Sequence, residues 1–274
     1  LGAALAVIAV AARGGSGGAA RTSPTAHAAR APHASPSRPP ASSDLAVKRL
    51  AAFGLPLYCG GTGKPLVALT YDDGPGPYTL KMIHKLKRHH LQATFFLVGK
   101  SIRSYPGLAR LERSVAVLGD RTLSHPFLPG LAAPAMAQEI SGAQTLIERS
   151  SGQRTVDLFR PPYGARSPAI DREAKSRGLL EVIWTIDSAD SLGANYAGIA
   201  SNVINGLRPG SIILMHENRG QTIRATLPIF TAIARKHLRA VTLPELLAQD
   251  PPTLAQLRAG GRGCGTRSST RTGA

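Results

Sequence analysis

The sequence is poor in aromatic residues and lacks any long apolar stretch. Aromatic side chains make up 5% of its 274 residues, with a single tryptophan, so flat surfaces on which an extended ligand could stack are sparse. Basic residues are not interleaved with aromatic ones and no nucleic-acid-binding motif accompanies them, which argues against a nucleic-acid partner. The apolar run over residues 1–12 is too short to cross a bilayer as a helix.

Acidic residues are also scarce. The chain has 16 Asp and Glu residues against 33 Lys and Arg, which gives a formal net charge of +17. Part of this charge lies toward the two ends of the chain, where it is usually a solvated feature that keeps a protein soluble. A functional interpretation is that the charge holds the protein close to an anionic cell wall or membrane surface.

The two ends of the chain differ in composition from its middle. Residues 1–28 combine the apolar run with the small-residue pattern Ala-His-Ala at residues 26–28, which resembles a secretory signal; the alternative is a leader with no targeting role. Residues 29–55 predict a flexible linker, and residues 251–274 predict a basic flexible tail, because neither has a helical or strand period. We therefore expect a secreted or cell-surface protein.

Only two cysteines are present, Cys59 and Cys264. In an exported protein they can pair and join the two ends of the folded region, whereas the alternative is two unpaired thiols. The loop that such a disulfide closes is long, and by the loop-entropy argument it contributes at most roughly 5 kcal/mol to stability.

Between residues 64 and 250, apolar runs alternate with amphipathic segments. The runs that predict strands are 66–71, 93–98, 114–118, 156–159, 180–186, 211–215 and 240–243, and the segments that predict helices are 78–89, 101–111, 134–150, 167–177, 196–207 and 222–236. Continuous apolar strands separated by such helices favour a parallel sheet covered by helices. About seven repeats in one domain-sized span favour an α/β barrel over an open sheet.

Polar residues follow several of these predicted strands. Asp72 and Asp73 end the first strand, Arg160 ends the fourth, Asp190 follows the fifth and His216 ends the sixth. In a parallel barrel all carboxyl ends of the strands lie on one face, which is where active sites are found. We therefore expect these five side chains to converge.

Together these residues have the chemistry of acid–base catalysis. Two adjacent carboxylates at a strand end diverge, so that one can act as a base while the other binds a cation. An arginine can orient a carboxylate and keep it ionised, and a histidine beside an acid can remain protonated and donate a proton. This is the minimum set for amide hydrolysis by an activated water. The alternative is a set of loop-capping carboxylates and an ordinary core histidine.

Two motifs give a family resemblance. Thr-Tyr-Asp-Asp-Gly-Pro at residues 70–75 and Arg-Pro-Pro-Tyr at residues 160–163 resemble motifs of the polysaccharide deacetylase family with the NodB homology domain, carbohydrate esterase family 4. The resemblance covers residues 66–247. It implies a single domain at residues 56–250 with a distorted (β/α) barrel, and removal of acetyl groups from N-acetylglucosamine polymers or acetylated xylan. Peptidoglycan is the first candidate substrate, and chitin-like oligomers and acetyl xylan are alternatives.

The resemblance also implies roles for particular residues. Asp72 would be the general base, with Arg160 positioning it. His216 would be the general acid that protonates the departing amine, with Asp190 tuning it. A water deprotonated by Asp72 would attack the acetamide carbonyl.

The resemblance implies substrate and metal positions as well. Pro161 and Tyr163 belong to the motif that would meet the substrate, the backbone N–H of Tyr163 would stabilise the oxyanion, and Leu214 would line the acetyl pocket. Asp73 and His125 would be metal ligands. The expected cofactor is a divalent metal, zinc first and cobalt or nickel as alternatives, bound weakly or not at all.

Two positions depart from the implied pattern. Ser191 stands where a tryptophan is usual, which removes one wall of the groove. Arg121 stands where the first of two histidines, four residues apart, would complete the metal site. Arginine remains protonated and repels a divalent cation, and Asp73 and His125 alone are too few, because a catalytic zinc usually keeps three protein ligands.

Three alternatives follow from Arg121. It swings away while Asp120 or a water completes a weaker metal site, or its guanidinium pairs with Asp73 and polarises the carbonyl without a metal. In the third, the domain is a catalytically inactive module that binds cell-wall polysaccharide. The presence of a base, an acid and an orienting arginine favours activity.

Overall fold

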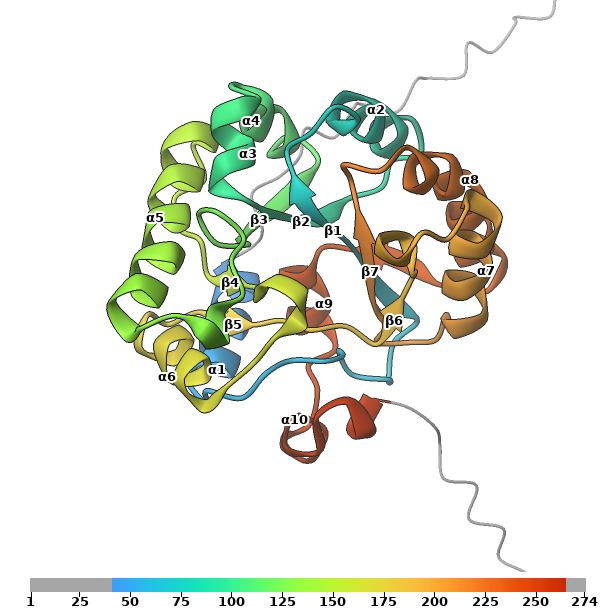
Figure 1. Cartoon of the computed structure of the whole chain (residues 1–274). Helices are drawn as coiled ribbons and strands as arrows, with labels where there is room; N and C mark the ends of the chain where they lie inside the picture. The colour runs from blue at the N-terminus through green and yellow to red at the C-terminus, as the bar shows by residue number, and fades with distance from the viewer. Residues whose placement is uncertain (1–40, 265–274) are drawn as a thin grey trace, which may run out of the picture. The chain divides into compact units, whose positions relative to one another are not determined.

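The computed structural model describes residues 41–264, which form a parallel sheet surrounded by helices (Figure 1). The strands are β1 (Leu66–Gly74), β2 (Ala93–Leu97), β3 (Ala116–Asp120), β4 (Leu158–Phe159), β5 (Leu180–Glu181), β6 (Ile186–Asp187), β7 (Ile212–His216) and β8 (Arg239–Val241). They follow the order β5-β4-β3-β2-β1-β7-β6, with β8 paired to β1, and every pair is parallel. The predicted parallel sheet is confirmed.

The sheet is curled into a half-barrel, and its connectivity explains why. β5 and β6 lie at opposite edges, although only residues 182–185 separate them along the chain. The five Cα–Cα steps from β5 to β6 extend at most about 17 Å, whereas a flat sheet of this strand order would hold its edges roughly 29 Å apart. The edges must therefore approach each other, and the strand ends surround a common centre.

Helices cover the outside of this sheet. The outer helices are α2 (Thr79–Arg88), α3 (Gly99–Ser104), α4 (Leu108–Glu112), α5 (Ala133–Ser151), α6 (Pro168–Ser176), α7 (Tyr196–Gly206) and α8 (Gly220–Arg235). Along β1, Leu69 and Tyr71 belong to the outer core with α2, α7 and α8, while Leu66 and Ala68 belong to an inner core with α1 and α9. Both faces of β1 are buried, which is why its sequence is a continuous apolar run.

The inner core corrects the expected flexible linker over residues 29–55. Within its described part, α1 (Ala41–Ala51) is a helix, and Val47 and Leu50 pack in the inner core against α9 (Leu243–Gln249). Apolar side chains three residues apart lie on one helix face, and the Ala, Leu, Lys and Arg residues of this segment favour a helix over a flexible linker. The predicted leader at residues 1–28 lies outside the described residues.

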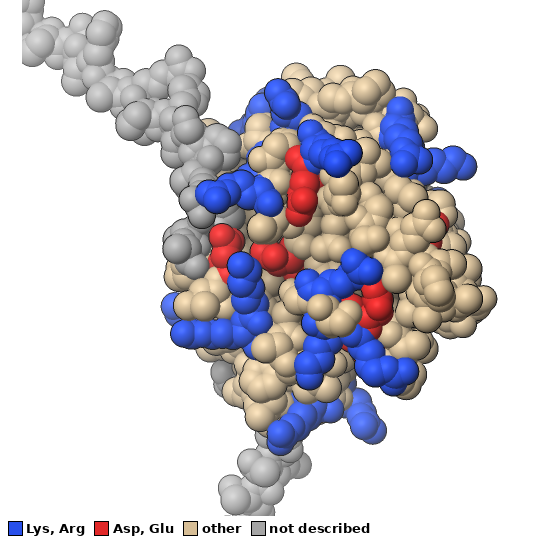
Figure 2. Space-filling view, turned by 90° about the vertical axis from the view of Figure 1, so that its left-hand side faces the viewer, with Lys and Arg blue, Asp and Glu red and all other residues tan. Residues whose placement is uncertain are grey.

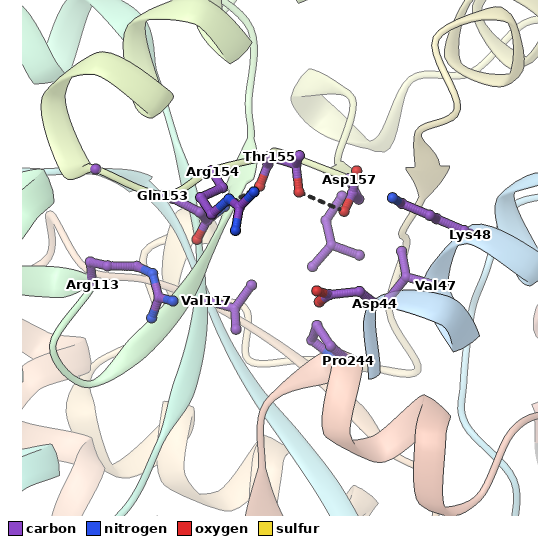
Figure 3. Close-up of a pocket in the computed structure, with 12 residues that line it drawn as sticks. Asp44, Val47, Lys48, Arg113, Val117, Gln153, Arg154, Thr155, Asp157 and Pro244 are labelled. Atoms are coloured by element: carbon purple, nitrogen blue, oxygen red, sulfur yellow. Dashed lines mark hydrogen bonds between the residues drawn. The ribbon is translucent and has the colours of Figure 1, made fainter. Parts of the chain in front are cut away.

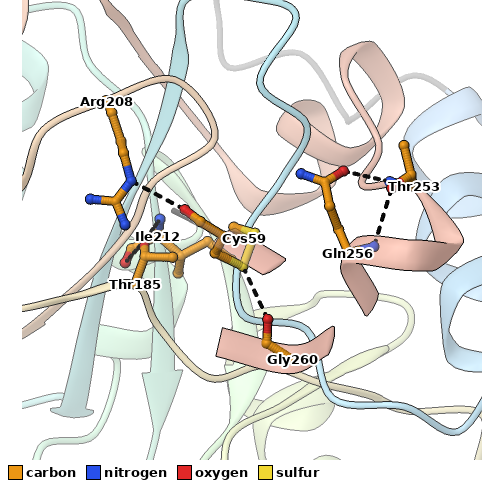
Figure 4. The surroundings of a disulfide bond; sticks show 8 residues. Cys59, Thr185, Arg208, Ile212, Thr253, Gln256 and Gly260 are labelled. Carbon is orange, nitrogen blue, oxygen red and sulfur yellow. Dashed lines mark hydrogen bonds between the residues drawn. A yellow bond between two sulfur atoms is a disulfide. The ribbon is translucent and has the colours of Figure 1, made fainter. Parts of the chain in front are cut away.

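The expected flexible tail over residues 251–274 is also wrong over its described part. α10 (Leu254–Ala259) begins with a capping box between Thr253 and Gln256, and a 3₁₀ turn (Gly260–Cys264) follows it. Cys264 forms a disulfide with Cys59 (Figure 4), and their two Cα atoms lie 5.7 Å apart. The predicted pairing is therefore confirmed. Arg208 Nε donates a hydrogen bond to the carbonyl of Cys264 and helps to hold this end of the chain.

Some strands are shorter than predicted. The run at 180–186 is not one strand but two, β5 and β6, because the chain crosses between the two edges of the half-barrel within it. The run at 156–159 contributes only the two residues of β4.

Among the described residues, none of the helices has both the length and the apolar character needed to span a membrane.

A cavity of about 390 Å³ lies at the amino ends of β3 and β4, away from the strand ends that carry the predicted site (Figure 3). Its lining includes the acidic side chains Asp44 and Asp157 and the basic side chains Lys48, Arg113 and Arg154. None of the predicted site residues lines it, so the cavity is separate from the chemistry described below.

Candidate active site

The two carboxylates at the end of β1 diverge as expected. Asp72 continues the inner face of β1 after Thr70, and its side chain is fully buried. Asp73 adopts the left-handed region with φ of 68°, so the chain turns and its carboxylate remains partly exposed. Gly74 follows because the side chain of Glu217 fills the space that a Cβ would occupy. Asp72 thus lies inside the site, and Asp73 lies at its more exposed side.

Arg160 holds Asp72 in place from β4. Its Nη1 donates hydrogen bonds to Asp72 Oδ1 at 2.7 Å and to the hydroxyl of Thr70 at 2.8 Å. Nε and Nη2 donate to the carbonyls of Val182 and Ile183, and the guanidinium stacks 4.1 Å above the ring of Phe96. Burial lowers the pKa of Arg160 to about 10, with the charge of Asp72 opposing that shift. The arginine remains charged at neutral pH and fixes the orientation of Asp72.

His216 is held by a different acid. Its Nδ1 lies 2.7 Å from Asp190 Oδ1, and its backbone N–H donates to Asp190 Oδ2 at 2.7 Å. The hydroxyl of Thr222 donates to the same Oδ2 at 2.6 Å. Burial alone would lower the pKa of His216, but its hydrogen bond with Asp190 and the nearby carboxylates raise that pKa above its usual value. The same contacts outweigh burial and lower the pKa of Asp190. His216 is therefore suited to donate a proton.

Arg121 lies between the two carboxylates of β1. Its Nε donates to Asp73 Oδ1 at 3.2 Å, Nη2 lies 3.2 Å from Asp72 Oδ2, and Nη1 donates to the carbonyl of Pro161 at 2.6 Å. His125 Nε2 lies 3.3 Å from Asp73 Oδ1. Burial tends to raise the pKa of Asp73, but His125 and Arg121 more than offset this effect. The pKa of Asp73 therefore lies well below its usual value.

The alternative in which Arg121 swings away and Asp120 serves as a ligand is not what the structure shows. Arg121 points at the carboxylates, whereas Asp120, the residue before it, accepts a hydrogen bond from the backbone of Thr122. Asp120 thus turns back onto the backbone that follows it, while Arg121 enters the site. Burial raises the pKa of Asp120 well above its usual value, which favours its protonated form.

The donor set does not fit the metal that the sequence implied. Asp73 and His125 are spaced like two ligands of a tetrahedral zinc, which lie roughly 3.3–3.6 Å apart at bond lengths of about 2.0–2.2 Å. Arg121 Nε donates to the same Asp73 oxygen, and a protonated guanidinium cannot serve as the third ligand. Within residues 41–264, no group of three or more His, Cys, Asp or Glu side chains is arranged to hold a metal ion.

The remaining predicted residues lie around this centre. Pro161 supplies the carbonyl that holds Arg121. Tyr163 has φ of 62° and projects outward with 64% of its surface exposed, while its ring packs edge-on against His125 at 4.7 Å between centroids. Leu214 is buried in β7 beside Thr70, two residues before His216. All the predicted site residues are thus brought to one end of the half-barrel.

Sequence reasoning missed a buried acidic pair behind the site. Glu217 follows His216 and accepts a hydrogen bond from the hydroxyl of Thr79 at 2.5 Å, and the carboxyl group of Glu112 lies against it. Glu112 Oε1 and Oε2 and Glu217 Oε1 have no donor among the described residues. Burial and mutual repulsion raise the pKa of Glu112 well above its usual value, and burial raises that of Glu217 to about 7. One shared proton satisfies this pair.

Sequence reasoning also missed Phe127 and Thr222. Phe127 is 59% exposed and its ring lies 6.5 Å from that of Tyr163, so two aromatic rings stand together beside His125. The only available signal for Phe127 was its position two residues after His125. Thr222 lies on α8, and no motif there indicated its contact with Asp190.

Comparison with known proteins agrees with this arrangement. The family model described as polysaccharide deacetylase matches residues 60–182. A peptidoglycan-N-acetylglucosamine deacetylase of Bacillus cereus is 32% identical over 195 residues, covering 69% of this chain and 70% of that protein. This chain therefore belongs to the polysaccharide deacetylase family, and its half-barrel matches the distorted (β/α) barrel that the sequence led us to expect.

Two solved structures share the fold. The structure of the Bc1960 peptidoglycan N-acetylglucosamine deacetylase with a hydroxamate-type ligand, 4-naphthalen-1-yl-N-oxidanyl-benzamide, has a TM-score of 0.67 and 30% identity, over 73% of this chain and 94% of that one. A CE4 family pseudoenzyme from Bacillus anthracis has a TM-score of 0.66 and 25% identity, over 70% of this chain and 68% of that one. The fold thus occurs both in a deacetylase and in a protein described as a pseudoenzyme.

Proposed function

We propose that this protein hydrolyses the N-acetyl groups of an N-acetylglucosamine-containing polysaccharide, with peptidoglycan as the first candidate and a chitin-like polymer as the second. The observation that carries the proposal is the pairing of Asp72 and His216. The two residues are register partners on β1 and β7, and each is held by its own oppositely charged partner. The relatives named above support the reaction class and the substrate class.

In this mechanism, Asp72 accepts a proton from a water molecule, and the hydroxide oxygen bonds to the acetamide carbonyl carbon. Arg160 keeps Asp72 oriented for that step. The backbone N–H of Tyr163 donates to the oxyanion of the tetrahedral intermediate. When the C–N bond breaks, its electron pair goes to nitrogen, and protonated His216 donates its Nε2 proton to the amine. The products are acetate and a free amino sugar.

Two surface features support a polymeric, anionic substrate. The exposed rings of Phe127 and Tyr163 lie next to His125, where a sugar ring can pack against them. Lys and Arg side chains outnumber Asp and Glu on the face shown in Figure 2. We propose that this charge holds the protein against an anionic cell wall, and that the chain is exported, which the disulfide supports. Wall binding should therefore weaken as salt is added.

A second candidate, an inactive module that binds cell-wall polysaccharide, has one observation in its favour. Asp72 is fully buried and pairs with Arg121 as well as Arg160, so two cations restrain the proposed base. Acetate release from N-acetylated peptidoglycan and from chitooligosaccharides distinguishes the two candidates. The deacetylase releases acetate from at least one of them. A protein that binds the polymer without releasing acetate is the binding module.

A further inference from the structure

Arg121 places a positive charge permanently in the candidate active site. Its guanidinium is buried, with 2% of the residue exposed, and it contacts four acceptors: Asp72, Asp73 and the carbonyls of Arg160 and Pro161. Withdrawing it would leave two carboxylates without that countercharge in a buried site, which is costly. The guanidinium is thus a fixed part of the site.

The carboxylates of this site already have cationic partners. Asp72 pairs with Arg121 and Arg160, and Asp73 pairs with Arg121. A divalent cation added beside Asp73 would bring two uncompensated positive charges into contact with a guanidinium. The Coulomb repulsion between a divalent cation and the guanidinium in contact with it is large in a buried site.

The geometry adds a second argument. Arg121 Nε lies 3.2 Å from Asp73 Oδ1, nearly the same distance as His125 Nε2 at 3.3 Å. The arginine therefore contacts the same carboxylate oxygen as His125 does. Because its N–H groups donate and cannot accept or ligate, it competes with a metal ion for that oxygen.

We propose that the guanidinium of Arg121 is the permanent cation of this site and takes the place of a divalent metal. The catalytic part of this inference rests on the proposed function. Nη2 carries two N–H groups in fixed directions, so its pairing with Asp72 uses one at most and leaves one to polarise an acetyl carbonyl oxygen. The chain would then hydrolyse acetamides in the presence of a chelator.

The test compares zinc binding by the full chain and by Arg121→His, each stripped with chelator, dialysed and titrated with zinc chloride by calorimetry. The wild type should take up no stoichiometric zinc. Arg121→His should bind about one equivalent, with an affinity at least roughly 100-fold higher, because Asp73 and His125 already have ligand spacing. Arg113→His, in the separate cavity, is the matched control and should behave as the wild type does.

Two further variants identify the site. Adding His125→Ala to Arg121→His should remove the new zinc binding, and Arg121→Lys should still exclude zinc because it keeps the charge. Uptake of one equivalent of zinc by the wild type would overturn the inference. The wild-type titration needs no variant, so the test stands even if Arg121→His does not fold.

Acetate release is measured on the same samples, with and without chelator. Release by the wild type that is insensitive to chelator supports the catalytic role of Arg121, and release that requires added zinc overturns it. If no sample releases acetate, the proposed function fails, while the zinc titrations alone decide whether Arg121 excludes the metal.

Discussion

Asp72 on β1 and His216 on β7 are register partners in neighbouring parallel strands, so their side chains leave the sheet on the same face. Arg160 approaches Asp72 from β4, and Asp190 approaches His216 from the loop after β6. The proposed base and the proposed acid are thus held at one level of the half-barrel by two independent partners. Each partner can be altered separately.

Replacement of Asp190 by Asn should move the basic limb of the pH–activity profile. Asp190 raises the pKa of His216, so its neutral amide should let that pKa fall and deprotonate the acid at a lower pH. We expect kcat to fall by about 10²-fold at alkaline pH and by less at acidic pH. Thr222→Val, which leaves the carboxylate in place, should shift the limb less. An unchanged basic limb in Asp190→Asn would argue against His216 as the acid.

Removal of the Phe127 ring should weaken polymer binding without disturbing the chemistry. Phe127 stands beside Tyr163 at the rim and touches none of the proposed acid–base groups. Phe127→Ala should raise KM for the polymer by about 3- to 10-fold, the value of one aromatic contact, with kcat unchanged. Phe53→Ala, another exposed aromatic position just after α1, is the control. If Phe127→Ala and Phe53→Ala had the same KM, Phe127 would not contribute to polymer binding.

The buried pair of Glu112 and Glu217 should make stability depend on pH. A carboxyl group whose pKa is higher in the folded protein binds more protons there than when unfolded, so the free energy of unfolding falls as pH rises through that range. For Glu217 the range runs from 4.5 to about 7. Over this range the raised pKa of Glu217 changes the free energy of unfolding by at most roughly 3 kcal/mol.

Glu112→Gln should flatten this dependence, because its amide N–H can donate to Glu217 and stabilise the ionised form. Urea unfolding between about pH 5 and pH 8 measures the effect, with Glu148→Gln on α5 as the control. The pKa of His216 is also raised, so the stability that His216 contributes is lost as pH rises above the usual pKa of histidine. This loss should be the same in Glu112→Gln and in Glu148→Gln. The same slope in wild type and Glu112→Gln would show that the pair does not share a proton.

Loss of the disulfide should destabilise the fold. Cys59 and Cys264 close a loop with a sequence separation of 205 residues, which by the loop-entropy argument contributes up to roughly 5 kcal/mol. Cys264→Ser should therefore lower the melting temperature, and reductant should lower that of the wild type but not of the variant. Identical melting curves with and without reductant would mean that the bond contributes nothing to stability.

How much of the site could be predicted depends on how local its signals are. The convergence of Asp72, Arg160 and His216 followed from strand order alone, because parallel strands place their carboxyl ends together. The direction taken by Arg121 could not be predicted, since a long flexible side chain can either enter a site or leave it. Only its contacts in the folded protein decide between the alternatives.

Other features had no local signal at all. Glu112 lies on a short helix without a motif, and nothing in the sequence connects it to Glu217 across the fold. Likewise the helix-forming residues of α1 do not show that it packs against α9 in the inner core. Such long-range packing is what sequence periodicity does not record.

The most direct test of the central claim is acetate release from N-acetylated peptidoglycan and chitooligosaccharides by the chelator-treated protein, compared with Asp72→Asn. We expect the wild type to release acetate and Asp72→Asn to be slower by about 10²- to 10⁴-fold, the contribution of a general base. Asp187→Asn, an exposed carboxylate at the end of β6, should match the wild type. Equal release by wild type and Asp72→Asn, or none from either substrate by the wild type, would contradict the account.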